Sequence, residues 1–268
     1  MEKTRFIEST CEILKQLREC SPLVLCLTNS VVQPITANLL LAAGAAPVML
    51  CDDKEVGELV AGGATGAFLV NLGTLSEAQA QTMRTAVEAA GARVPWVLDP
   101  VAVGALSLRT RFADELLKKK PTLIRGNASE IMALAGFGAS ARGPESTCGS
   151  DAAVEAARKL AAQSGAVVLV TGAVDYVTDG TEVFAFGNGN ALATRVTGVG
   201  CSMGALAAAC LAVAQTPLEA AVANALIMGI VGDIAAETAR GSGSFAVELI
   251  DALYNLSEND VRARARIL

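Results

Sequence analysis

The residues with the clearest chemical potential in this 268-residue chain form a glycine-containing turn before a long apolar stretch. Gly198, Gly200 and Cys201 lie within Thr197-Gly198-Val199-Gly200-Cys201, and an alanine-rich run typical of a helix follows. Glycine lets the backbone approach a ligand closely, and a helix start offers free N–H groups and the positive end of the helix dipole. The segment therefore predicts a binding place for an anion, such as a phosphoryl group in transfer.

Cys201 falls in the first turn of this predicted helix, where the dipole is expected to lower the pKa of a thiol. A partly ionised thiol can accept the proton of an attacking hydroxyl group. A tight turn beside a buried cysteine explains the same residues equally well. A dinucleotide fingerprint fits poorly, because the spacing through Gly204 is G-x-G-x-x-x-G, and the Gly-Lys pair of a Walker loop is absent from the sequence.

Polar residues follow several of the predicted strands. Asn29 comes shortly after the first strand, Asp99 ends the fourth, Arg125 and Asn127 follow the fifth, and Thr171 ends the sixth. In an open parallel sheet, ligands bind beyond the carboxyl ends of the strands. These side chains are therefore expected to converge along one edge and to form a site.

Glu130 stands three residues after Asn127, at the start of a predicted helix. Because the chain has no histidine, a bound metal would need oxygen ligands, which indicates Mg²⁺ held by Glu130 through water, with Asp99 as a second acidic contact. Arg125 offers a planar charged fork for phosphate oxygens. The alternatives are a helix-capping carboxylate at Glu130, which is favoured when that residue is taken alone, and a surface salt bridge at Arg125.

Short apolar runs alternate with helical stretches, and the last quarter of the chain has a helical pattern. Continuous apolar runs such as 167–170 are typical of parallel strands covered by helices on both sides. The predicted strands span 23–27, 47–50, 67–71, 96–99, 122–125, 166–171, 176–178 and 183–186. The predicted helices span 4–18, 33–43, 76–90, 110–119, 128–134, 151–163, 201–214, 218–239 and 245–256. This order predicts one α/β domain over 1–268 with a doubly wound, mostly parallel sheet and a loop at 136–150.

Composition excludes several classes of protein. The net charge of −6 gives no broad positive field for nucleic acid or an anionic membrane. Seven cysteines without a C-x-x-C pair indicate a reducing compartment, and the N-terminus does not resemble a signal peptide, so a cytoplasmic protein is predicted. The uncharged stretch 196–218 has an apolar interior too short to cross a bilayer and is interpreted as a core helix.

Several segments, taken in order, resemble the hydroxyethylthiazole kinase family, which has the ribokinase-like fold. The similarity covers about residues 20–255. The matching segments are 27–29 (Leu-Thr-Asn), 37–38 (Ala-Asn), 44–49 (Gly-Ala-Ala-Pro-Val-Met), 71–75 (Asn-Leu-Gly-Thr-Leu), 98–101 (Leu-Asp-Pro-Val), 124–131 (Ile-Arg-Gly-Asn-Ala-Ser-Glu-Ile), 170–172 (Val-Thr-Gly), 175–180 (Asp-Tyr-Val-Thr-Asp-Gly), 197–201 (Thr-Gly-Val-Gly-Cys) and 243–245 (Gly-Ser-Phe).

The resemblance implies a three-layer α/β/α kinase that uses ATP and Mg²⁺ to phosphorylate the hydroxyl of 4-methyl-5-(2-hydroxyethyl)thiazole in thiamine salvage. It also implies a homotrimer with active sites at subunit interfaces. By position in the motifs it assigns the thiazole contacts to Met49, Gly198 and Asn29, the ATP contacts to Arg125, Thr171 and Asn127, and the Mg²⁺ contacts to Asp99 and Glu130. Cys201 would stand where related kinases carry an aspartate base, beside the anion turn of Gly198 and Gly200.

The chain departs from the family pattern at two positions. Leu25 stands where family members often have histidine, and Ala173 where they usually have glutamate. Other functions remain open from the sequence: a hydroxymethylpyrimidine or pyridoxal kinase, an ATP-dependent dehydratase, a nicotinamide oxidoreductase, or a non-catalytic binding protein. Release of ADP with a panel of alcohols separates the kinases and the dehydratase, and binding of NAD(P)H decides the oxidoreductase. A non-catalytic protein predicts no ADP release with any alcohol.

Overall fold

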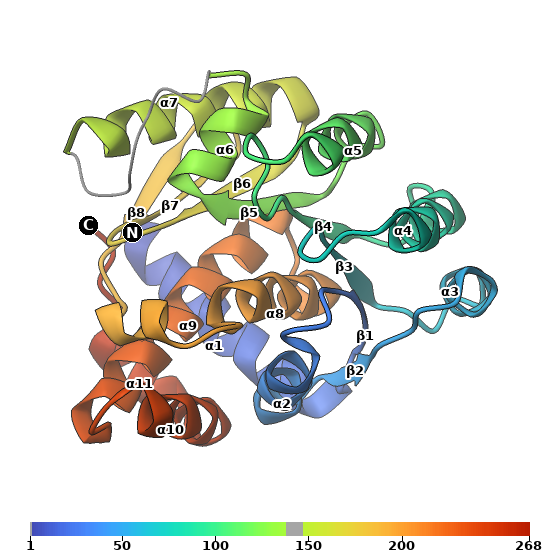
Figure 1. Ribbon diagram of the computed structural model, residues 1–268. Helices are drawn as coiled ribbons and strands as arrows, with labels where there is room; N and C mark the ends of the chain where they lie inside the picture. Colours follow the sequence, from blue (N-terminus) through green and yellow to red (C-terminus); the bar gives the residue numbers. More distant parts are fainter. Residues whose placement is uncertain (1, 138–146) are drawn as a thin grey trace.

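The computed structural model describes residues 2–137 and 147–268. Eight strands of these residues form one sheet in the order β2-β1-β3-β4-β5-β6-β7-β8 (Figure 1). The neighbours from β2 to β6 are parallel, and β7 and β8 are antiparallel. The strands are β1 Leu23–Leu27, β2 Ala46–Val48, β3 Ala67–Asn71, β4 Trp96–Asp99, β5 Leu123–Asn127, β6 Val167–Thr171, β7 Asp175–Thr178 and β8 Val183–Phe186. The predicted, mostly parallel sheet is confirmed.

The central strands are apolar at successive positions because both of their faces are covered. β3 is buried at every position. Its side chains alternate, so that Leu69 packs into the core on one face while Phe68 and Val70 pack into the core on the other. This pattern explains why continuous apolar runs were reliable strand signals.

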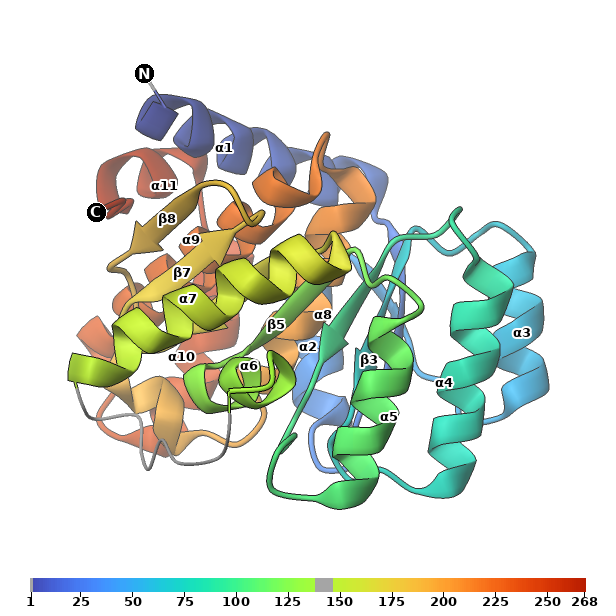
Figure 2. The ribbon, with the colours of Figure 1, turned by 90° about the horizontal axis from the view of Figure 1, so that it is seen from above.

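Helices cover both faces of the sheet (Figure 2). One face carries α3 Asp53–Ala61, α4 Glu77–Ala90, α5 Ser107–Leu117, α6 Ala128–Leu134 and α7 Thr147–Ser164. The other face carries α1 Glu2–Cys20, α2 Gln33–Ala43, α8 Val199–Val213 and α9 Pro217–Thr238, with α10 Ser242–Asn255 and α11 Glu258–Arg264 packed outside them. A short 3₁₀ helix, η1 Ala191–Arg195, precedes α8. The result is a three-layer α/β/α arrangement.

Two helices, α3 and α11, were not predicted, and both have clear start signals. Asp52 accepts a hydrogen bond from the backbone N of Lys54 at 2.9 Å and caps α3. Ser257 and Asp260 form a capping box at the start of α11. Both helices are short, with nine and seven residues, so neither offers a long apolar stripe as a sequence signal. The predicted loop at 136–150 lies mostly outside the described residues.

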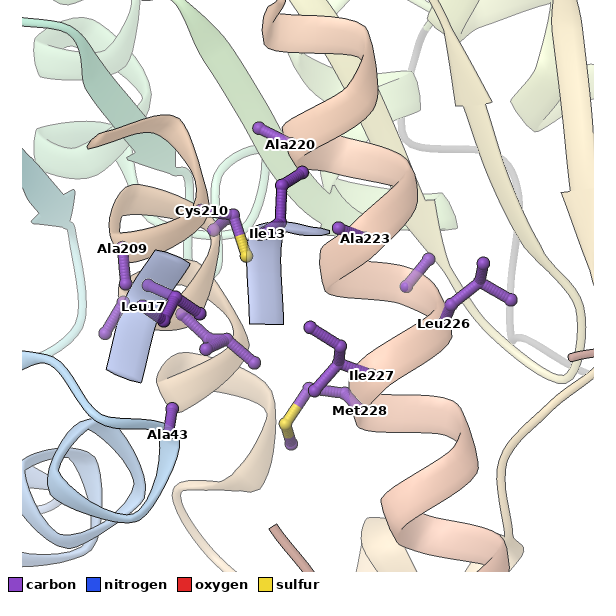
Figure 3. Packing of buried hydrophobic residues seen from close by; sticks show 14 of the residues in the cluster. Ile13, Leu17, Ala43, Ala209, Cys210, Ala220, Ala223, Leu226, Ile227 and Met228 are labelled. Carbon is purple, nitrogen blue, oxygen red and sulfur yellow. The ribbon is translucent and has the colours of Figure 1, made fainter. Parts of the chain in front are cut away.

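Helices α8 and α9 lie side by side and form the centre of one core (Figure 3). Ala220, Ala223 and Ile227 of α9 lie there with Ile13 of α1 and Cys210 of α8. α9 is long and apolar enough to cross a membrane, but 83% of its most apolar window is buried inside the protein. Burial in this core therefore accounts for its composition.

α8 runs along the sheet from the carboxyl ends of the strands to their amino ends. Gly204, in the first half of α8, lies beside Asp99, the last residue of β4: a Cβ at Gly204 would be 3.2 Å from Asp99 Oδ2. At the other end, a Cβ at Gly66, just before β3, would be 3.0 Å from the Cβ of Ala212. The predicted glycine-rich turn therefore opens onto the same edge as the polar strand ends.

Candidate active site

The polar strand ends meet along one edge of the sheet, as predicted. Asn71 at the end of β3 is paired in register with Asp99 at the end of β4. Asn127 at the end of β5 is paired with Thr171 at the end of β6. Two neighbouring polar pairs are thus set by strand register alone.

A buried hydrogen-bond network joins the first pair to the residue after β1. Asn71 Nδ2 donates to Asp99 Oδ2 at 2.7 Å, and Asn29 Nδ2 donates to Asn71 Oδ1 at 3.0 Å. The exposed fraction is 0% for Asn71 and Asp99 and 5% for Asn29. Asn71 was not among the predicted site residues; its position at a strand end, in register with Asp99, is the signal that could have found it.

Arg125 is 8% exposed, so the alternative of a surface salt bridge is wrong. Its Nη1 lies 3.7 Å from Asp99 Oδ2, and its Nη2 donates to Thr171 Oγ1 at 2.9 Å. Arg125 Nε and Asp99 Oδ1 are buried and have no hydrogen-bond partner among the described residues. A buried charge with unused hydrogen-bonding capacity indicates a place for a ligand.

Two buried carboxyl groups at this edge have altered proton affinities. Burial raises the pKa of Asp99 to about 7, although the Arg125 charge opposes the shift. Burial also raises the pKa of Asp175, the first residue of β7, to about 6, although its hydrogen bond from the backbone N of Gly172 opposes the shift. Burial at this edge of the sheet therefore disfavours the charged form of both carboxyl groups.

The start of α8 lies open beside Arg125. Gly198 precedes the helix with a φ of 99°, and a Cβ there would be 2.5 Å from Ile35 Cγ2, so this turn requires glycine. No side chain of the described residues caps the helix start. Its first N–H groups, including those of Gly200 and Cys201, have no acceptor within the helix. A Cβ at Gly200 would be 3.5 Å from Arg125 Nη2, so the guanidinium group lies against this first turn.

Cys201 is half-buried, and its Sγ accepts a hydrogen bond from Asn29 Nδ2 at 3.4 Å. Burial raises the pKa of the thiol, and the charge of Asp99 raises it further. The prediction of a lowered thiol pKa is therefore wrong, because desolvation outweighs the helix start here. The thiol carries its proton near neutral pH.

Glu130 and Asn127 form a capping box at the start of α6. Asn127 Oδ1 accepts from the backbone N of Glu130 at 3.0 Å, and Glu130 Oε2 accepts from the backbone N of Asn127 at 2.9 Å. Glu130 Oε1 accepts from the backbone N of Ala102 at 3.1 Å. The capping interpretation is thus confirmed. Each oxygen of this half-buried carboxylate keeps a lone pair for a further contact.

The predicted thiazole and ATP contacts lie on opposite halves of the edge. Met49, half-buried, follows β2, and Asn29 follows the neighbouring strand β1. Arg125 and Thr171 belong to β5 and β6, while α8 packs on β1, β3 and β4 between the two halves. Gly198 contacts Val32 and Ile35 at the start of α2 and so adjoins the first half.

The two departures from the family pattern have different surroundings. Leu25 is fully buried in the core under α3–α7. Ala173 is exposed just after β6, beside the ATP half of the edge. A shallow surface hollow of about 350 Å³, next to Trp96 and Thr122, is at the amino ends of the strands and away from this edge.

Comparison with known proteins gives a consistent result. A family model described as hydroxyethylthiazole kinase family matches residues 14–259. A hydroxyethylthiazole kinase of Akkermansia muciniphila is 58% identical over 269 residues, covering 100% of this chain and 99% of the relative. A solved hydroxyethylthiazole kinase structure from Pyrococcus horikoshii OT3 has a TM-score of 0.89 at 40% identity, covering 97% of this chain and 98% of that one. A ribokinase-like superfamily protein of Enterococcus faecalis, 13% identical over 92% of this chain and 95% of its own, has a TM-score of 0.65, which shows the ribokinase-like fold.

Proposed function

This chain belongs to the hydroxyethylthiazole kinase family, and from that premise we propose how it works. It transfers the γ-phosphate of ATP to the hydroxyl of 4-methyl-5-(2-hydroxyethyl)thiazole in thiamine salvage. The observation that carries the proposed mechanism is the buried guanidinium of Arg125 against the open first turn of α8. Positive charge and free N–H groups there converge on one point, which suits a phosphoryl group in transfer.

Each half of the edge holds one substrate. Arg125, Thr171 and Asn127 bind ATP over β5 and β6. Met49, Asn29 and Gly198 bind the thiazole alcohol over β1 and β2, with its hydroxyl toward the start of α8. The N–H groups of that turn hold the oxygens of the transferred group while its charge shifts.

Positioning and charge stabilisation supply most of the rate in phosphoryl transfer, and a base contributes less. The raised pKa of the Cys201 thiol fits this division, because a protonated thiol is a weak proton acceptor. As a proton acceptor for the substrate hydroxyl, Cys201 therefore makes a smaller contribution to the rate than positioning and charge stabilisation do.

The residues present fit a bound Mg²⁺. Asp99 Oδ1 is buried without a partner in the described part of the chain, and Glu130 keeps free lone pairs. A cluster of three metal-ligating side chains is not found among residues 2–137 and 147–268, so Asp99 and Glu130 would share the ion with water and phosphate oxygens. When bound, Mg²⁺ supplies charge neutralisation at the phosphates.

We further propose a cytoplasmic, single-domain subunit over 1–268 that forms a homotrimer with active sites at its interfaces. One continuous sheet crosses the whole fold. The homotrimer is the expectation that the family resemblance of the sequence implies. Six cysteines are unpaired, which fits a reducing compartment; they are Cys11, Cys20, Cys26, Cys51, Cys201 and Cys210.

The decisive experiment is a coupled assay of ADP release with the thiazole alcohol, with and without Mg²⁺. ADP release that needs both the alcohol and Mg²⁺ is expected. Pyridoxal, hydroxymethylpyrimidine and an alcohol-free reaction are the controls. Faster ADP release with pyridoxal or hydroxymethylpyrimidine than with the thiazole alcohol would overturn the proposed substrate.

A further inference from the structure

The side chain of Asn71 is the centre of the buried network and has no part in the chemistry described so far. Its Oδ1 accepts from the backbone N of Gly73 and from Asn29 Nδ2, both at 3.0 Å, and its Nδ2 donates to Asp99 Oδ2 at 2.7 Å. With an exposed fraction of 0%, the amide exchanges none of these partners for water.

Two backbone groups fix the direction of both amides. A main-chain N–H can only donate, so the Asn71 atom bonded to Gly73 N must be the oxygen. In the same way, the backbone N of Val31 donates to Asn29 Oδ1 at 3.2 Å. The Nδ2 of each side chain must therefore face its other polar neighbours.

The orientation of the two amides determines which hydrogen-bond donors face Cys201 and Asp99. Asn29 points an N–H donor at Cys201 Sγ, and such a donor stabilises a thiolate more than a thiol. Asn71 points its donor at one oxygen of Asp99, which leaves the other oxygen without a partner in the described part of the chain. One amide therefore sets the surroundings of both groups.

Close packing makes the arrangement specific. A Cβ at Gly73 would be 2.6 Å from Asn29 Nδ2, so only glycine allows the Asn29 amide to lie where it does. Gly73 thus both donates to Asn71 and makes room for Asn29.

We propose that Asn71 is a positioning residue for phosphoryl transfer, which holds the Asn29 amide against Cys201 and the Asp99 carboxyl beside Arg125 through a single side chain. The inference rests on the proposed kinase function. Asn71 links the thiazole half of the edge to the ATP half and touches neither substrate.

The test compares Asn71→Leu and Asn71→Asp with the wild-type enzyme. Leucine keeps the approximate volume and removes every hydrogen bond, whereas aspartate keeps the acceptors and removes the donor to Asp99. We expect kcat with the thiazole alcohol to fall about 10- to 100-fold in both variants, as for other residues that orient a reacting group. The KM for ATP should stay within about threefold, because Arg125 and Thr171 are untouched.

Asn224→Leu is the matched control. Asn224, in α9, is also 0% exposed, and its amide has no partner among the described residues. Its replacement removes a buried amide of the same size from a helix that carries none of the proposed site residues, so kcat should not change.

A second measurement does not depend on turnover. We expect the rate of Cys201 alkylation by iodoacetamide, followed by peptide mass spectrometry, to fall about fivefold in Asn71→Leu, the effect of one lost hydrogen bond to the sulfur. Thermal melting identifies a variant that does not fold. Should Asn71→Leu fail in this way, Asn71→Asp carries the kinetic test.

The outcomes separate the two ideas. A folded Asn71→Leu enzyme with wild-type kcat and wild-type Cys201 alkylation would overturn the role of Asn71. Loss of kcat together with an equal rise in both KM values would overturn it as well, because a general structural fault has that effect. If the wild-type enzyme does not phosphorylate the thiazole alcohol, the proposed function fails, and unchanged alkylation in Asn71→Leu would then overturn the Asn71 contacts separately.

Discussion

Helices α8 and α9 are alike in composition and lie side by side, but they begin in different ways. The bodies of both are alanine-rich and buried. α9 begins with Thr216, whose side chain accepts from the backbone N of Glu219 at 3.2 Å, followed by Pro217. α8 begins at Gly198 without such a cap and has the buried Arg125 beside it.

The difference separates folding from function. The bodies of the two helices stabilise the protein by removing apolar surface from water. At the start of α9, the Thr216 side chain accepts a hydrogen bond from a backbone N–H of the first turn. The start of α8 has unused N–H groups and an adjacent positive charge, and our proposal assigns these features to binding of the transferred phosphoryl group.

Replacing a core side chain in α9 should give the largest effect and should change stability only. We expect Leu226→Ala to lower the free energy of unfolding by about 2–5 kcal/mol, because the fully buried side chain leaves a cavity. Urea unfolding measures the loss. Val247→Ala, at a residue 59% exposed, is the control and should change little. A fall in kcat of the folded Leu226→Ala enzyme would contradict the idea that the helix bodies contribute to stability alone.

Removing the positive charge beside the start of α8 should mainly weaken the binding of ATP. We expect Arg125→Ala to raise the KM for ATP about 100-fold, since the loss of one partner leaves the buried Asp99 carboxyl uncompensated as well. Steady-state kinetics measure the change. Arg93→Ala, which removes an exposed arginine from the other end of the sheet, is the control. Unchanged ATP affinity in Arg125→Ala would contradict the assignment.

Two cysteines of α8 give a comparison within one helix. We expect Cys201→Ala to lower kcat about 10- to 100-fold without abolishing activity, because positioning supplies most of the rate. Cys210→Ala, in the fully buried body, should alter stability and leave kcat unchanged. Equal kinetic effects in both variants would show that the first turn has no special role.

The buried carboxyls at the edge make stability depend on pH. The pKa of Asp175 is raised from 3.8 to about 6 in the folded protein, so its favourable contribution is complete below pH 4 and is lost as the pH rises to about 6. We expect Asp175→Asn to gain stability over the wild type by on the order of 2 kcal/mol between pH 4 and pH 7. Melting curves at both values test this, and a constant difference would contradict it.

Removing the N-cap of α9 should have the smallest effect of these substitutions. We expect Thr216→Ala to cost about 1 kcal/mol of unfolding free energy, the usual effect of a lost N-cap. Its kcat should equal that of the wild type. A kinetic effect would mean that the starts of the two helices are not independent.

The fold was predictable where burial dictates residue type. The continuous apolar runs of β1, β3 and β4 were placed residue for residue, and the end of β5 was missed by two residues because Gly126 and Asn127 are polar or small. The short helices α3 and α11 were missed because a capping residue is a weaker signal than a long apolar stripe.

The convergence of the predicted site residues could be predicted from the sequence, but their electrostatics could not. The strand ends and the turn at Gly198 were expected at one edge of the sheet, and the structure places them there. The pKa of Cys201 could not be predicted, because it depends on burial and on Asp99, which is distant in the sequence. Asn71 was missed for a similar reason: its importance comes from strand register and from partners in two other segments, Asn29 and Asp99.

The two ends of α8 lie at opposite edges of the sheet, which provides an attachment position far from the proposed active site. Gln215, exposed just beyond α8, lies near the amino ends of the strands, at the far end of the helix from Cys201. A fluorophore or a surface tether attached through Gln215→Cys would leave the proposed active site open to solution. Single-molecule or immobilised assays of turnover can therefore be built on this position, once the exposed Cys20 and Cys51 are replaced by serine and the labelling conditions leave the half-buried Cys201 unmodified.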